Sequence, residues 1–129
     1  MKKIIFIILL FFSVCTHAET HNKSASFFYK FIKEAQKPYR MIHIRGILEG
    51  ISATYMHENF SFDKNEEDRN LRSNVVICLL TTDPEIIEDI FVKKYLEAEF
   101  NDEAFYFEAL YETSIEYCIK KESNKNKVM

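Results

Sequence analysis

Apolar side chains recur every three to four residues in several segments of this chain, the spacing that places them on one face of an α-helix. Residues 26–35 place Phe27, Phe28, Phe31, Ile32 and Ala35 on one side, and residues 39–58 place Ile44, Ile47, Leu48, Ile51 and Tyr55 within one arc. Two further periodic segments run from a start near residue 82 to about 99, and from Asn101 or Asp102 to about 119. The pattern predicts an all-α fold, a small bundle of about four helices.

The connections between these segments carry weaker signals. Residues 59–74 are polar without a strong period, which predicts a long loop or one weak helical turn. Loops of that length in compact domains are often functional, so this one is a second candidate surface. After a short apolar run at 75–80, Thr82 precedes Glu85 by three residues, which predicts a capping box with Thr82 as the N-cap.

Glycine is rare, and its placement is informative. The chain has only two glycines and two prolines, too few for the tight turns of a small β-sandwich or barrel. Gly46 and Gly50 lie one turn apart inside the predicted helix 39–58, where each costs roughly 1 kcal/mol relative to alanine. This spacing indicates close approach of another surface, either a helix of the same domain or a partner, including a second copy of the chain.

The N-terminus has the order of an export signal. Lys2 and Lys3 precede an unbroken apolar run at 4–12, which is shorter than the roughly 20 residues that a spanning helix needs. A small-residue site at 16–18 follows, so residues 1–18 are predicted to be a cleaved signal peptide. We therefore expect one helical domain at 19–119, a flexible Lys-rich tail at 120–129 and a periplasmic location. An anchor helix, or lipidation of Cys15, is the alternative.

Charge limits the class of partner. The formal net charge is −3, and it becomes −5 when the leader's two lysines are removed. A negative chain is a poor ligand for nucleic acid and for anionic membranes. Residues 83–116 hold eleven acids and two lysines, so the C-terminal half would suit a basic protein partner.

The cysteines predict one disulfide. Cys15 leaves with the signal peptide, and an exported chain with only Cys78 and Cys118 left most simply bonds them. If the last two periodic segments form an antiparallel hairpin, the bond closes it, because one cysteine just precedes the first segment and the other ends the second.

No residue pattern indicates catalysis. The chain lacks a glycine-rich phosphate loop, and His43 and His57 lie about 21 Å apart along one helix, too far to share a metal ion. We expect no cofactor, no metal and no enzymatic activity. Glu108, Glu112 and Glu116 form an acidic stripe along the last helix, and Phe105 lies within it. Such a stripe is often only a solvated face, but an aromatic side chain among charges resembles an interface anchor with a polar rim.

Several segments together resemble a known family. These are Arg45-Gly46-Ile47-Leu48-Glu49-Gly50, Val76-Ile77-Cys78-Leu79 before a capped helix, Lys93-Lys94-Tyr95-Leu96-Glu97-Ala98, and an acidic helix ending in Tyr117-Cys118. Over about 39–119 the chain is similar to the Rap/Tai family of type VI secretion immunity proteins. It departs from the family in the residues after Cys78, where Leu79-Leu80-Thr81-Thr82 intervenes, and in lacking a cysteine near its first helix.

The resemblance implies a helical periplasmic protein that binds and inhibits a peptidoglycan amidase effector. It would have no catalytic groups of its own and would act by blocking the effector. The alternative is a periplasmic protein of the same fold that acts as a chaperone or another binding module.

Overall fold

The structure is a computed structural model that describes residues 23–59 and 65–128; the predicted signal peptide and Cys15 lie outside these ranges. The described residues form five helices: α2 (Ala25–Glu34), α3 (Lys37–Asn59), α4 (Glu66–Thr81), α5 (Pro84–Leu96) and α6 (Tyr106–Val128). The predicted all-α class is confirmed, but the described chain has one helix more than the four expected.

The additional helix is α4, which replaces most of the predicted loop. Asn65 caps its start, because the Asn65 side chain accepts a hydrogen bond from the Asp68 amide at 2.9 Å. Acidic side chains fill the first turn, where they favour the positive end of the helix dipole. The apolar period begins only in the second half, where Val75, Cys78 and Leu79 are buried, so hydrophobic spacing alone underestimates the helix.

The boundary between α4 and α5 lies one residue later than predicted. Thr82 ends α4, and its amide and its hydroxyl both donate to the Cys78 carbonyl oxygen. Asp83 is the N-cap of α5, and its carboxylate accepts from the Glu85 amide at 2.9 Å. Thr82 therefore serves the preceding helix and is not the predicted N-cap.

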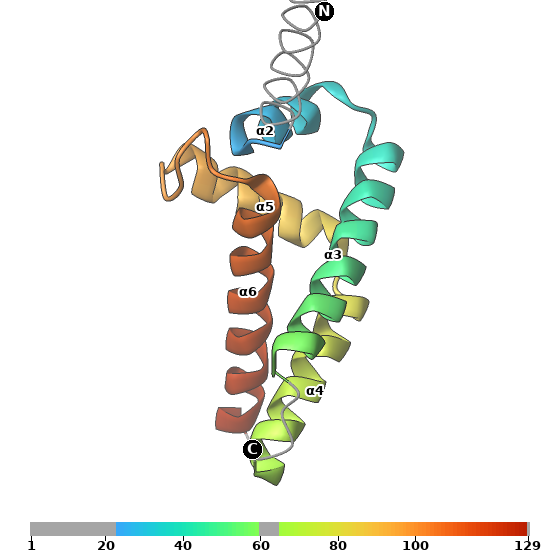
Figure 1. Ribbon diagram of the computed structural model, residues 1–129, viewed down its shortest axis with the longest axis vertical. Helices are drawn as coiled ribbons and strands as arrows, with labels where there is room; N and C mark the ends of the chain where they lie inside the picture. Colours follow the sequence, from blue (N-terminus) through green and yellow to red (C-terminus); the bar gives the residue numbers. More distant parts are fainter. Residues whose placement is uncertain (1–22, 60–64, 129) are drawn as a thin grey trace, which may run out of the picture.

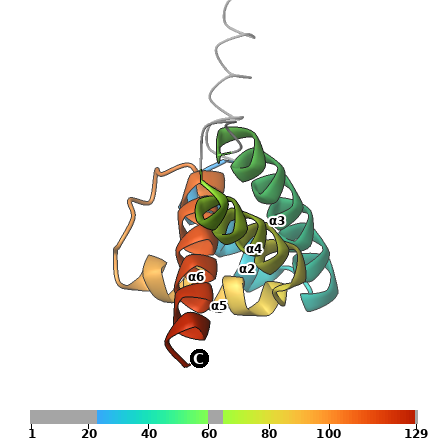
Figure 2. The same ribbon diagram turned by 90° about the horizontal axis from the view of Figure 1, so that it is seen from below.

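Two long helices set the shape of the molecule. Figure 1 shows α3 and α6 along its length, with α5 crossing between them near the end that carries α2. Seen from below, α4 lies between α3 and α6 (Figure 2). The fully buried large side chains come from all five helices: Phe28, Ile44, Leu48, Ile51, Val75, Leu79, Ile87, Phe91 and Leu110.

The predicted disulfide joins Cys78 to Cys118, with their Cα atoms 5.8 Å apart. The bond was expected to close an antiparallel hairpin of the last two helices. That expectation is wrong, because α5 crosses α6 and does not run antiparallel beside it. The bond instead fastens α4 to the middle of α6. It closes a separation of 40 residues, for which the chain-entropy model gives about 4 kcal/mol of stabilisation.

The last helix also ends later than expected. It continues to Val128, so most of the predicted flexible tail is helical. Glu122 in this extension is buried, and its carboxylate pairs with Lys125 at 2.7 Å. The Lys-rich composition is compatible with this, because lysine is a good helix former and favours a helix C-terminus.

The start of α2 is tied to the start of α6. The Ala25 amide donates to the Ala104 carbonyl oxygen at 2.7 Å, and the Tyr106 amide donates to the Lys23 carbonyl oxygen at 2.8 Å. These bonds satisfy amides that a helix start leaves without an intrahelical partner. The short antiparallel pairing, centred on Ser24 and Phe105, fixes the backbone that carries the Phe105 ring.

A second tie joins α3 to α5. The Arg40 guanidinium donates to both carboxylate oxygens of Glu88, at 3.0 and 3.1 Å, and also to the Ala35 carbonyl oxygen at 2.8 Å. The Glu88 side chain is only 7% exposed, so this bidentate pair is largely shielded from water.

Candidate protein-binding surface

Phe105, the predicted interface anchor, lies directly before α6 and is 40% exposed. Its ring contacts those of Tyr106 and Phe107, with centroid separations of 5.9 and 6.4 Å. The side chain is thus held by its backbone pairing with Ser24 and by neighbouring rings while a large part of it remains in solvent.

The predicted acidic stripe is divided by an ion pair. Glu116 accepts from the Lys94 ammonium at 2.5 Å, and Lys94 also lies 3.6 Å from Glu99. The hydrogen bond from Lys94 lowers the pKa of Glu116, and the charge of Lys94 adds to the effect. Glu116 therefore links α6 to α5, whereas Glu108 and Glu112 are exposed and form no ion pair with any residue that the structure describes.

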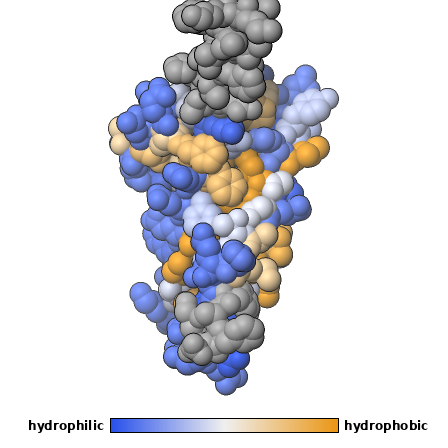
Figure 3. Space-filling model, in the orientation of Figure 1, coloured by the Kyte–Doolittle hydropathy of each residue, from blue (hydrophilic) through white to orange (hydrophobic). Residues whose placement is uncertain are grey.

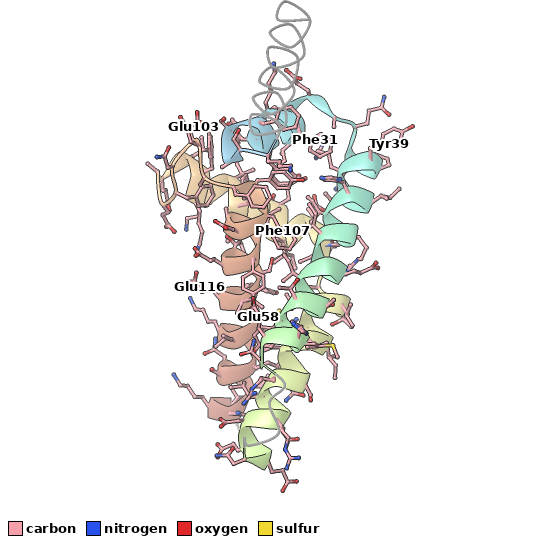
Figure 4. The ribbon with its side chains drawn as sticks, viewed as in Figure 1. Phe31, Tyr39, Glu58, Glu103, Phe107 and Glu116 are labelled. Atoms are coloured by element: carbon pink, nitrogen blue, oxygen red, sulfur yellow. A yellow bond between two sulfur atoms is a disulfide. The ribbon has the colours of Figure 1, made fainter. Side chains whose placement is uncertain are left out.

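Phe105, Glu108 and Glu112 form one side of a groove between α6 and α3. Its lining also includes Thr54 and Glu58 of α3, and Phe107 and Tyr111 of α6. Figure 4 shows Phe107 between the two helices, with Glu58 further along the same gap. We call these seven residues the α3–α6 groove.

One hydrogen bond spans the groove. The Tyr111 hydroxyl donates to Glu58 Oε2 at 2.6 Å. Burial raises the pKa of Tyr111 to about 12, and the hydrogen bond to the Glu58 carboxylate adds to that rise. At neutral pH Tyr111 is therefore a fixed donor that orients the Glu58 carboxylate.

The two glycines are not at a close helix contact. A Cβ atom placed on Gly46 would have no described atom within 4 Å, and one on Gly50 would lie 4.0 Å from Phe107 Cε2. The prediction that they allow tight packing within the domain is therefore wrong for the described residues. They share the i, i+4 stripe of α3 with Thr54 and Glu58, which line the groove, whereas the glycines precede the lining on the same stripe.

The surface around the groove is mixed in polarity. Figure 3 shows apolar and pale side chains gathered over the middle of this face, within hydrophilic surroundings. The lining of the α3–α6 groove contains three carboxylates and no basic side chain. Its charge is therefore not neutralised by the residues that form it.

No three His, Cys, Asp or Glu side chains among the described residues are grouped so that they could hold a metal ion. His43 packs against the rings of Phe28 and Phe31, with centroids 6.0 and 5.1 Å away. None of the described helices combines the length and the apolarity that crossing a membrane requires.

The sequence did not indicate four of the seven residues that line the groove: Thr54, Glu58, Phe107 and Tyr111. The position of Glu58 could have been inferred from the sequence, because it lies eight residues after Gly50 and therefore on the same stripe of α3. Phe107 and Tyr111 follow the apolar period of the last helix, which is equally typical of core residues, and the packing of α3 beside α6 shows that they line the groove.

No family model, no curated protein and no solved structure matches this chain.

Proposed function

We propose that this protein is a non-catalytic periplasmic immunity protein that binds a basic peptidoglycan amidase effector of type VI secretion and blocks it. The observation that carries the proposal is the exposed combination of Phe105, Glu108 and Glu112 at the start of α6. An aromatic anchor beside carboxylates without cation partners is suited to a basic protein surface.

The scaffold supports this role through its rigidity. The disulfide holds α6 against α4, and the backbone pairing at Ser24 holds the residues just before α6. A surface that is already ordered loses little conformational entropy when a partner binds, so more of the interaction energy appears as affinity. The family resemblance of residues 39–119 supplies the class of partner.

Inhibition would need no chemistry from this chain. Covering the effector's cleft is sufficient, and opposite charges on the two surfaces raise the rate of association. Truncation of a central aromatic side chain acts mainly on dissociation, whereas reversal of a rim charge acts mainly on association and on its salt dependence.

The test is survival of cells that produce, in the periplasm, any peptidoglycan amidase encoded beside this protein. We expect co-production of the protein to restore growth. In vitro, Glu108→Lys with Glu112→Lys should slow association most at low salt, and Phe105→Ala should shorten the lifetime of the complex.

The matched control is Glu66→Lys with Glu67→Lys, which changes the net charge equally at the exposed start of α4. It should have a smaller effect on association than the pair on α6. Absence of both protection and a complex would reject the immunity function. Binding of unfolded clients in place of a folded amidase would support the chaperone alternative.

A further inference from the structure

We infer that the α3–α6 groove binds an arginine side chain that protrudes from a basic protein partner. The identity of the partner rests on the proposed function, whereas the preference of the groove for a guanidinium group rests on its own lining. The lining combines the aromatic rings of Phe105, Phe107 and Tyr111 with three carboxylates.

The groove has room for such a side chain. The α3 side of the lining begins at Thr54, and Gly50, one turn before it, adds no side chain; a Cβ atom there would lie 4.0 Å from Phe107 Cε2. Thr54, next along the stripe, turns its hydroxyl back to the Gly50 carbonyl oxygen at 3.0 Å. The Thr54 hydroxyl is therefore used within α3, and on this wall Glu58 is the residue that offers acceptors to a ligand.

The carboxylates supply the charge. Glu58 Oε2 is occupied by the Tyr111 hydroxyl, which holds the carboxylate in place and leaves Oε1 able to accept from a ligand. Glu108 and Glu112 on the opposite wall are exposed and have no basic partner among the described residues. A cation between the two walls would therefore meet carboxylates from both helices.

Charge complementarity favours this occupant over two others. A neutral apolar segment would cover these carboxylates without giving them a counter-charge, which is unfavourable. A second copy of the chain would place an identical acidic groove against the first one, and like charges oppose that contact. A guanidinium satisfies both parts of the lining, since its flat face stacks on aromatic rings while its N–H groups donate to carboxylates.

The probe is the peptide acetyl-Gly-Arg-Gly-amide, titrated into the oxidised, ¹⁵N-labelled protein. The control peptide carries citrulline, which has a similar shape and no charge. We expect saturable shifts of the Thr54, Phe107 and Glu108 amide resonances, which belong to the groove lining, with the arginine peptide, and shifts at least several-fold smaller with citrulline. Glu58→Gln with Glu112→Gln should weaken binding about tenfold, which corresponds to loss of about 1.4 kcal/mol.

The matched control variant is Glu66→Gln with Glu67→Gln, which removes the same charge from the start of α4 and should leave the affinity unchanged. Equal shifts with citrulline, equal or larger shifts around residues 66–68, or no saturable shift at the residues that line the groove would each overturn the inference. An amidase complex that forms unchanged despite Glu58→Gln with Glu112→Gln would reject the arginine site and leave the proposed function standing. Arginine binding without protection from any amidase would reject the proposed function and leave the arginine site standing.

Discussion

Replacing the two helical glycines by alanine tests most directly whether the glycine stripe of α3 is free of close contacts. Glycine inside a helix costs roughly 1 kcal/mol relative to alanine, because it has more backbone freedom to lose on folding. A methyl group on Gly46 would have no described atom within 4 Å, and one on Gly50 would make an ordinary van der Waals contact with Phe107. Neither substitution thus incurs a steric penalty that could cancel the gain in helix propensity.

We expect Gly46→Ala and Gly50→Ala each to raise the free energy of unfolding by about 1 kcal/mol, and the double variant by about 2 kcal/mol. Urea unfolding of the oxidised protein measures this, and an unchanged slope would show that the surface exposed on unfolding is the same. The thermal midpoint should rise by about 4 °C for each substitution. A lower free energy of unfolding for Gly46→Ala would refute the absence of close contacts around this residue, because it would require a contact that the described residues do not contain.

Four further substitutions test other contacts. Cys118→Ser should lower the free energy of unfolding by about 2–5 kcal/mol, and an unchanged urea midpoint would show that the disulfide contributes little. Arg40→Met should cost about 3 kcal/mol by leaving the buried Glu88 carboxylate unpaired, and the double change with Glu88→Leu should recover much of this loss. The Ser114 hydroxyl is buried without a hydrogen-bond partner among the described residues, so Ser114→Ala should be neutral or stabilising; destabilisation above about 1 kcal/mol would contradict this. The pKa of Tyr111 is raised to about 12, so the folded state keeps a proton that the unfolded state loses near pH 10. The free energy of unfolding should therefore fall as the pH rises from about 10 to about 12, and Tyr111→Phe should make this fall smaller.

The prediction of helices from hydrophobic spacing was correct where an apolar face continues through a whole helix. The face of Ile44, Leu48 and Ile51 is buried in α3 as expected. In α4 the first two turns are charged and solvent-exposed, so spacing gave no signal there. The evidence lay in the cap, since Asn65 followed by three acids is a typical helix start.

Periodicity identifies the faces of a helix but not the neighbours of each face. The stripe of Gly46 and Gly50 could have met another helix or solvent, and the structure leaves it without a close contact among the described residues. For the same reason, the pairing of the cysteines was predictable from their number, whereas the helices that they join were not.

The backbone pairing between the two ends of the domain has a consequence for the order of folding. A polypeptide emerges N-terminus first from the ribosome or from a translocation pore, so Ala25 is available roughly 80 residues before its partner Ala104, a loop whose closure entropy opposes early pairing. Until then the Ala25 and Ser26 amides lack their acceptors, the carbonyl oxygens of Ala104 and Asp102. The contacts of α3 with α4 link nearer parts of the chain and can form during that wait. Docking of α2 is thus a late step, and the backbone beside Phe105 takes its final form only when the chain is almost complete.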